Sequence, residues 1–548
     1  MHLSRKLLLV TTVTHCLFAQ DAFKAMELIK AKDILAGVQV LSADDMEGRG
    51  AGTAGERKAA EWIAEQFKNA GLQPVSGSYF QEIEMVGFRK VKGSLSLTGA
   101  SGDIPFVDDE TLTYWSSSQK EQVAMANAPL VFVGYGVEAP EYGWDDFKGF
   151  DATGKILVFL NNDPPVTEHG KSLFGGEART YYGRWTYKFE QAMRHGALGA
   201  MVIHTTPSAG YDWSVIGHSG VEEGFSLPLP GTGFKLDLLA WVHQDLAQVL
   251  AASVGETLES WFDQAKSRTF KPQPLPVKAS CEMTIQMRKT KTQNVMAVWP
   301  GSDPQLKNQH VVFSAHYDHI GVIGDGEGDH IFNGAWDNAL GTSSIIAIAK
   351  AFSKGKVTPK RSILFLACAA EESGSLGSHW FVARPPIPRS DLVANINIDM
   401  PQVLGLTRDM AAIGYETNSL GQALVDTAKS FPSGAVVIRG DVDPNAGSFY
   451  RSDQVNFAKA GIPALFLNPG TDYVTPPAVA LVDYEADKYH QADDEIDEHW
   501  ELSGCERDMR VAFLLALRIA NQAQMPHWNP GNEFEAAWQA LHGSDASP

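Results

Sequence analysis

Three stretches between residues 311 and 374 each place a histidine or a carboxylate at the edge of an apolar run. They read V-V-F-S-A-H-Y-D-H (311–319), N-G-A-W-D-N-A-L-G (333–341) and I-L-F-L-A-C-A-A-E-E-S-G (363–374). Ionisable groups in such positions are costly in a core but useful as metal ligands. His316 and Asp318 are two residues apart, so an extended strand points them to the same side. We therefore expect a site for divalent metal ions, and a hydrolase.

The candidate metal ligands are imidazoles and carboxylates without a thiolate: His316, Asp337, Glu372, Asp399 and His490. Ligands of these types suit zinc. Two zinc ions roughly 3.5–4 Å apart can share one carboxylate. We expect Asp337 to be the shared ligand, because it stands where a helical pattern begins between two strands. The expected cofactor is thus two zinc ions per chain.

Two further residues are expected to take part in the chemistry. Zinc lowers the pKa of a bound water to about 7, so that hydroxide is available at neutral pH. Glu371, next to the ligand Glu372, is the expected general base. Asp318 is expected to hold the free N–H of the His316 imidazole. Taken singly, each of these residues is typical of surface or capping positions, as are His319, His330, His379 and His499; the ordered set indicates a site.

The elements that must position these residues form a regular alternation. From residue 294 onward, short apolar strands alternate with helical patterns, which predicts an α/β fold with a mixed, largely parallel central sheet flanked by helices. Ligands of such sheets gather beyond the carboxyl ends of the strands. His316, Glu371, Glu372 and Asp399 all stand at that end of a predicted strand. Helices are expected at 56–70, 338–352 and 505–524.

Length and charge limit the remaining organisation. A chain of 548 residues is too long for one ordinary domain, so we expect two, one inserted in the other. Its net charge of −20 argues against nucleic acid or an anionic membrane as a partner. The cysteines outside the N-terminal leader are expected to be packing residues: Cys281, Cys368 and Cys505.

The N-terminus resembles a secretory signal peptide, because Arg5 and Lys6 precede a short apolar run. The protein is therefore expected to be secreted or periplasmic. The run is too short to span a membrane, and no other segment is long enough. The expected division is a signal peptide (1–20), an N-terminal part of the catalytic domain (21–127), an insert (128–275), the main catalytic part (276–525) and a C-terminal tail (526–548).

Five motifs resemble, in order, those of the M28 family of zinc metallopeptidases. They are H-Y-D (316–318), N-G-A-W-D-N-A-L-G (333–341), A-A-E-E-S-G-S-L-G-S (369–378), N-I-D-M (397–400) and Y-H-Q-A-D-D (489–494). The insert is similar, more loosely, to a protease-associated (PA) domain, which would be β-rich. Gln454 stands where relatives often have histidine, so it is not expected to bind metal.

The resemblance implies a zinc exopeptidase-like sandwich that acts on peptides. It implies one zinc ion on His316, Asp337 and Asp399, and the other on Asp337, Glu372 and His490. It also implies Glu371 as the general base and Asp318 as the orienting residue.

Several functions are compatible with this resemblance. We expect an aminopeptidase. One alternative is a carboxypeptidase of the glutamate carboxypeptidase type, with Arg451 binding a substrate carboxylate. Another is a glutaminyl cyclase, which uses a single zinc ion. A non-catalytic, receptor-like binding protein is the third, and the retention of all ligands argues against it. Side-chain preference and oligomeric state do not follow from the sequence.

Overall fold

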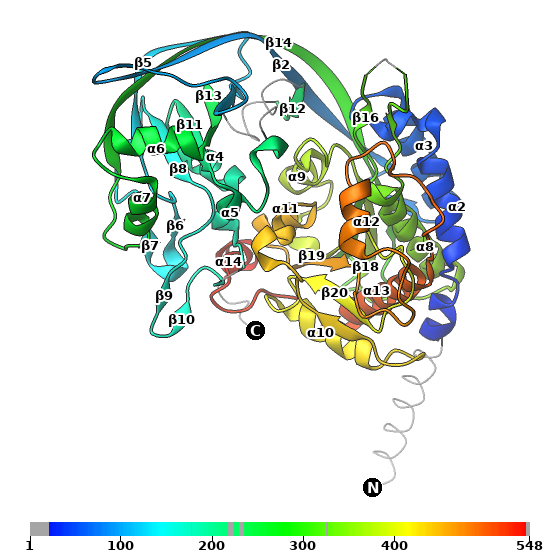
Figure 1. Ribbon diagram of the computed structural model, residues 1–548. Coiled ribbons are helices and arrows are strands. Elements are labelled where there is room, and N and C mark those ends of the chain that lie inside the picture. The colour runs from blue at the N-terminus through cyan, green and yellow to red at the C-terminus, as the bar shows by residue number, and fades with distance from the viewer. Residues whose placement is uncertain (1–20, 177, 217–222, 229–234, 325–326, 544–548) are drawn as a thin grey trace. The chain divides into compact units, whose positions relative to one another are not determined.

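The computed structural model describes residues 21–543, apart from residues 177, 217–222, 229–234 and 325–326 (Figure 1). The predicted signal peptide lies outside these residues. The chain divides into two compact units. The first is bounded by Met1–Ile83, Lys291–Val442 and Arg451–Pro548, and the second by Glu84–Thr290 and Asp443–Tyr450. The expected insert boundaries at 128 and 275 fall inside strands β5 (Gln122–Phe132) and β14 (Gln273–Trp299).

The first unit is built on a mixed sheet in the order β21-β20-β22-β19-β15-β18-β14. β15 is parallel to both β18 and β19, and β19 is parallel to β22, whereas β14 runs antiparallel to β18. The predicted mixed, largely parallel sheet is therefore confirmed. The strands besides β14 are β15 (His310–His316), β18 (Ser362–Cys368), β19 (Leu392–Ile398), β20 (Asp409–Ile413), β21 (Val437–Arg439) and β22 (Ala464–Asn468).

Helices cover this sheet. α8 (Gly341–Lys354) and α13 (Ser503–Asn521) pack on each other and on the central strands β15 and β19. α2 (Ala31–Leu41) and α3 (Ala54–Asn69) pack on α8. α9 (Leu376–Ala383) and α11 (Gln454–Lys459) pair with each other, and α11 lies on β19 and β22. All residues of β18 and β19 are buried, as expected for strands covered on both faces.

The predicted helix at 56–70 is α3, and its sequence explains its bounds. The Thr53 side chain accepts a hydrogen bond from the backbone N–H of Glu56, which caps the first turn. Ala59, Ile63 and Phe67 recur at helical spacing and are buried. The helix also packs against the preceding segment Asp44–Arg49.

The second unit has its own hydrophobic core, built around five strands. Its strands follow the order β5-β8-β11-β13-β4, parallel except for β4. They are β4 (Leu112–Trp115), β5, β8 (Ile156–Leu160), β11 (Gly199–His204) and β13 (Leu238–His243). Helix α4 (Trp185–Arg194) packs on β11, and α6 (Gln244–Ala252) packs on β13. Phe159, Phe189 and Trp241 are among the buried core residues, as an independent domain requires.

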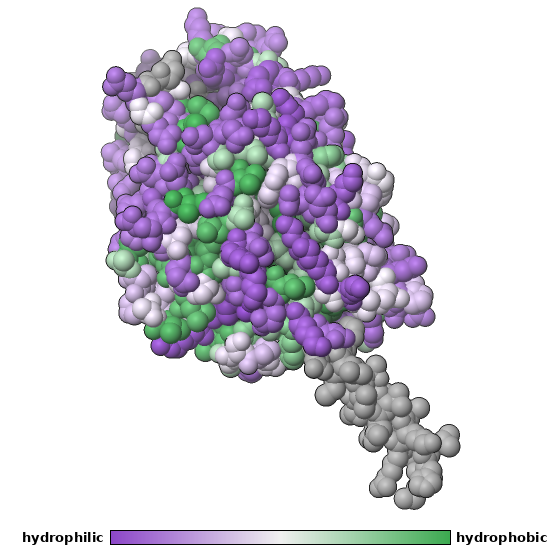
Figure 2. Space-filling model, turned by 90° about the vertical axis from the view of Figure 1, so that its right-hand side faces the viewer, coloured by the Kyte–Doolittle hydropathy of each residue, from purple (hydrophilic) through white to green (hydrophobic). Residues whose placement is uncertain are grey.

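Figure 2 shows a largely hydrophilic face on which apolar residues lie in small groups between polar ones. None of the helices in the described part of the chain is long and apolar enough to cross a membrane. Cys281, Cys368 and Cys505 are free thiols and are buried, so the prediction that they serve as packing residues is confirmed.

Candidate metal centre

The centre lies where the parallel strands of the first unit end. His316 is the last residue of β15 and pairs with Cys368, the last residue of β18. Asp399 directly follows β19, and Glu371 and Glu372 follow β18 within a short turn. Because the carboxyl ends of parallel strands meet at one edge of a sheet, these side chains are brought together, as the sequence predicts.

Asp337 lies at the middle of the centre. It is in the turn Ala335–Leu340, directly before α8, and it is buried. Its Oδ1 atom is 3.1 Å from Nε2 of His316, and its Oδ2 atom is 3.4 Å from Nε2 of His490. The two carboxylate oxygens therefore face two different imidazoles.

Each of these imidazoles is paired with a further carboxylate. Nε2 of His316 is 3.2 Å from Oδ1 of Asp399, and Nε2 of His490 is 3.0 Å from Oε2 of Glu372. His316, Asp337 and Asp399 thus form one cluster, and Asp337, Glu372 and His490 form a second. The potential ligand atoms all lie within 4.8 Å of one another in the first cluster, and also in the group of His319, Asp337 and Glu372. All five predicted ligands are brought together.

The charges of the centre call for a cation. Burial opposes protonation of His316, but Asp399 and Asp337 outweigh it and hold its pKa well above the usual value. Burial likewise opposes protonation of His490, whereas its bonds with Asp337 and Glu372 raise its pKa to about 10. The carboxylates therefore favour the protonated, positively charged form of both imidazoles. Metal ions would replace these protons, because ligands must be deprotonated to bind them. The donor set thus fits zinc.

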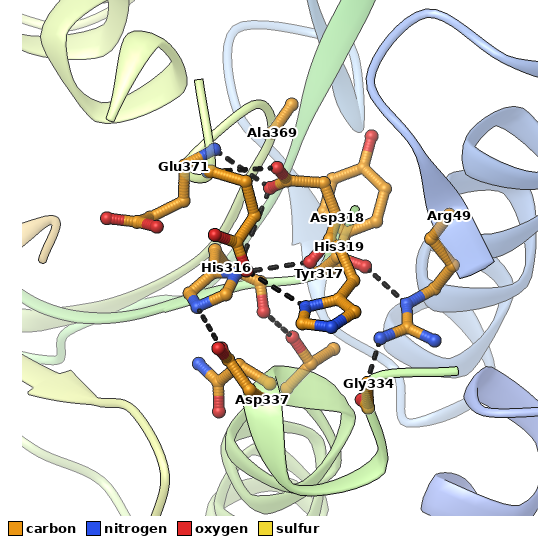
Figure 3. Close-up of polar contacts among 12 residues, drawn as sticks. Arg49, His316, Tyr317, Asp318, His319, Gly334, Asp337, Ala369 and Glu371 are labelled. Atoms are coloured by element: carbon orange, nitrogen blue, oxygen red, sulfur yellow. Dashed lines mark hydrogen bonds and ion pairs between the residues drawn. The ribbon is translucent and has the colours of Figure 1, made fainter. Parts of the chain in front are cut away.

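Glu371 and Asp318 lie beside the clusters (Figure 3). Burial, together with the charge of Glu372, raises the pKa of Glu371 well above its usual value, although His316 opposes this. Ser375 donates a hydrogen bond of 3.0 Å from Oγ to Oε1 of Glu371. A half-buried carboxyl with a raised pKa beside potential ligands is suited to proton transfer.

Asp318 makes contacts that differ from the expected ones. Nδ1 of His316 lies 3.2 Å from the backbone carbonyl oxygen of Asp318 and 3.9 Å from its carboxylate Oδ1. The carboxylate instead accepts the backbone N–H groups of Glu371 at 3.0 Å and of Glu372 at 3.3 Å. Asp318 therefore holds the imidazole through its main chain, and its side chain holds the turn that carries the two glutamates.

Arg49 links the loops that carry the ligands, as Figure 3 shows. Its guanidinium is fully buried and donates to the backbone carbonyls of Tyr317 at 2.7 Å, Asn333 at 2.6 Å and Gly334 at 2.8 Å. It also donates to the carbonyl of Leu41 at 2.5 Å. Tyr317 follows His316, and Gly334 precedes Asp337 by three residues. One side chain therefore sets the spacing between two ligand loops.

Asp494 joins the other side of the same loop to the segment of His490. Its Oδ1 accepts the backbone N–H of Trp336 and its Oδ2 accepts that of Asp337, both at 2.9 Å. Asp494 is buried, and its backbone carbonyl accepts the N–H of Ala335 at 2.9 Å. The turn that presents Asp337 is thus hydrogen-bonded to the segment that presents His490.

Sequence reasoning missed two residues of the centre. His319 is buried within it, 2.9 Å through Nδ1 from Oε1 of Glu372, and is neither a surface nor an ordinary packing histidine. Its separation of three residues from His316 was the available signal.

Arg49 is the second residue that sequence reasoning missed, and it stands in the G-R-G of the glycine-rich segment. An added Cβ at Gly48 would lie 2.5 Å from the carbonyl oxygens of Gly321 and Phe332, so only glycine permits this close approach.

The part of the chain that carries this centre is similar to known proteins. Residues 294–511 match the model described as Peptidase family M28. The chain is 25% identical over 479 residues to aminopeptidase YwaD of Bacillus subtilis (strain 168), over 85% of this chain and 82% of that protein. It is 27% identical over 188 residues to leupeptin-inactivating enzyme 1 of Streptomyces exfoliatus. That match spans 34% of this chain and 38% of the relative.

The fold is also shared with a solved structure. The aminopeptidase from Aneurinibacillus sp. strain AM-1 superposes with a TM-score of 0.51 and 17% identity. The match covers 93% of this chain and 97% of that one. At this identity the likeness concerns the fold, and it agrees with the mixed α/β architecture described above.

Proposed function

We propose that this chain, whose residues 294–511 match the model of peptidase family M28, is a zinc aminopeptidase with two metal ions per chain. One observation carries this proposal: the two oxygens of Asp337 face two imidazoles, His316 at 3.1 Å and His490 at 3.4 Å. A carboxylate between two such clusters is suited to bridge a pair of ions. The name of the relative, aminopeptidase YwaD, favours aminopeptidase activity.

We assign the ligands by cluster. His316, Asp337 and Asp399 would hold one ion, and Asp337, Glu372 and His490 the other. Bound zinc would supply a Lewis acid for the peptide carbonyl and make water a nucleophile at neutral pH. A glutaminyl cyclase would need a single ion, so the number of ions per chain separates the two functions.

Glu371 is the proposed general base. Its carboxyl would take the proton from the attacking water and deliver it to the leaving amine. The bond from Ser375 to Oε1 of Glu371 orients this carboxyl. Asp318 is proposed to be a positioning residue. Its carboxylate accepts hydrogen bonds from the backbone N–H groups of Glu371 and Glu372, and so fixes both glutamates relative to the substrate.

The direction of attack on peptides is tested with matched substrates. The purified, zinc-loaded protein is assayed on aminoacyl anilides with a free amine and on N-acetylated peptides with a free carboxylate. Cleavage of the anilides alone, abolished by a zinc chelator, supports the aminopeptidase. Cleavage of the blocked peptides alone would contradict it and favour the carboxypeptidase, in which exposed Arg451 would bind the substrate carboxylate. Cleavage of neither substrate would contradict both.

Two further assignments belong to this proposal. The second unit is proposed to be the PA-like insert, because it has its own hydrophobic core. The protein is proposed to be exported, because the start of the chain resembles a signal peptide. Sequencing the N-terminus of protein recovered outside the cytoplasm tests export: a start near residue 20 supports it, and an intact Met1 contradicts it.

A further inference from the structure

His319 occupies a defined place beside the second cluster. It is 1% exposed, and its Nδ1 atom lies 2.9 Å from Oε1 of Glu372. The other oxygen of Glu372, Oε2, is 3.0 Å from Nε2 of His490. The two oxygens of one carboxylate are therefore divided between two imidazoles, of which only His490 also contacts Asp337 within ion-pair distance, at 3.4 Å.

The chemistry of the contact determines which nitrogen carries the proton. An ionised carboxylate only accepts hydrogen bonds, so Nδ1 of His319 must be the donor. In a neutral imidazole the second nitrogen, Nε2, is then the one with the free lone pair. It has no hydrogen-bond partner among the residues that the structure describes. The ring thus presents its N–H to Glu372, as metal-ligating carboxylates are commonly held in proteins.

The ring is fixed in this orientation by backbone on its other side. An added Cβ at Gly334 would lie 2.5 Å from Cγ of His319, so the ring is packed directly on the glycine. The backbone N–H of His319 donates to the carbonyl of Arg49 at 3.3 Å. A His319 side chain held from both sides imposes its hydrogen-bond direction on Glu372.

We propose that His319 is a positioning residue of the metal centre. Its Nδ1–H donates a hydrogen bond to one oxygen of Glu372, so that the other oxygen is directed to the ion held with His490 and Asp337. The inference rests on the proposed two-zinc function. His319 acts through Glu372 in this proposal. The alternative, that His319 is itself a ligand beside Asp337 and Glu372, whose potential ligand atoms lie within 4.8 Å of its own, is an outcome of the test. Removing such a hydrogen bond to a ligand commonly weakens metal binding about 10- to 100-fold.

Two substitutions separate positioning from ligation. In His319→Asn the amide nitrogen is as many bonds from Cα as Nδ1, so it can still donate to Oε1 of Glu372. In His319→Gln the amide nitrogen corresponds to Nε2, which makes no such bond. His319→Ala removes both nitrogens. His310→Asn, at the opposite end of β15, is the matched control for loss of an imidazole on the same strand.

The measurement is the dissociation constant of each zinc ion, obtained by competition with a zinc-binding indicator, together with zinc content per chain. We expect His319→Ala and His319→Gln to lower the affinity for one zinc ion about 10- to 100-fold and to change the affinity for the other little. We expect His319→Asn and His310→Asn to remain near wild type. Circular dichroism melting shows whether each variant is folded. If His319→Ala does not fold, the comparison of His319→Asn with His319→Gln decides the test.

Two results would overturn the inference. Wild-type affinity for both ions in His319→Gln would show that His319 does not position Glu372. Equal loss in His319→Asn and His319→Gln would mean that the imidazole is itself a ligand. Neither result depends on wild-type stoichiometry: a wild-type protein that binds one ion contradicts the two-zinc proposal, whatever the variants do.

Discussion

Replacing Arg49 by lysine should reduce turnover and zinc binding as well as destabilise the fold. The guanidinium makes four hydrogen bonds to backbone carbonyls, of Leu41, Tyr317, Asn333 and Gly334. Lysine is a point donor and cannot reach four carbonyls that surround a planar fork. Hydrogen bonds to charged groups contribute about 1.5–3 kcal/mol each. Losing two of them would cost on the order of 3–6 kcal/mol of unfolding free energy.

Arg361 offers a matched control. It too is buried, with 1% exposure, and its guanidinium donates to the carbonyls of Ile519 at 3.0 Å and Gln522 at 2.5 Å. Those carbonyls belong to the end of α13 and carry no metal ligand. Arg361→Lys should therefore destabilise the fold by a comparable amount and leave the centre unchanged.

The assay compares turnover of an aminoacyl anilide with bound zinc, at a temperature at which both variants are folded. Displacing a catalytic loop by about 1 Å can reduce turnover about 100-fold. We expect a loss of that order, with weaker zinc binding, in Arg49→Lys, and near wild-type values in Arg361→Lys. If Arg49→Lys melts as Arg361→Lys does but keeps wild-type turnover and zinc, Arg49 stabilises only the fold and our reasoning is wrong.

Substitutions of Asp494, Glu371 and Glu56 give three further predictions. Asp494→Asn loses one of the two acceptors for the turn of Asp337, so zinc affinity should fall about 10- to 100-fold in chelator competition; unchanged affinity would contradict the positioning of that turn. Glu371→Gln should retain full zinc content and lose turnover about 100- to 10,000-fold, and undiminished turnover removes Glu371 from the mechanism. Burial raises the pKa of Glu56 to about 8, so the folded chain retains a proton that the unfolded chain releases near pH 4.5. Its contribution to stability is therefore present below about pH 4.5 and is lost as pH rises through about 8. Denaturant melts should show a smaller fall from pH 5 to pH 8 in Glu56→Gln than in wild type, and an equal fall would refute the assignment.

The sequence predicts the centre well where it depends on strand ends. His316 and Asp399 lie at the carboxyl ends of β15 and β19, whose apolar runs are clear from the sequence. A parallel sheet must bring such ends to one edge, so residues far apart in the chain can be assigned to one site. The same reasoning predicts the α/β fold of the first unit, because alternating strand and helix patterns specify it.

Residues beyond regular elements are harder to predict. Once β15 ends at His316, no periodicity indicates where His319 points, and its contact with Glu372 depends on the turn after another strand. Arg49 is separated from Tyr317 by 268 residues and lies in a segment with positive φ at both Gly48 and Arg49. Glycine-rich sequences predict such turns but not the carbonyls that a buried side chain will reach.

The contacts of Asp318 illustrate a third limit. Its spacing from His316 predicts that both lie on the same side of the chain, but not which atoms meet. The carboxylate is 3.9 Å from the imidazole and accepts two backbone amides of the following ligand turn instead. Spacing therefore identifies the residue, whereas its hydrogen-bond partner depends on the tertiary structure.

The most direct test of the central claim is the zinc affinity of the two sites when Asp337 and Asp399 are changed separately to alanine. If Asp337 is shared, Asp337→Ala should lower the affinity for both zinc ions. Asp399→Ala should lower the affinity for one ion and leave that for the other near the wild-type value. One ion bound to Asp337→Ala with unaltered affinity would contradict a bridging carboxylate and the two-ion centre built on it.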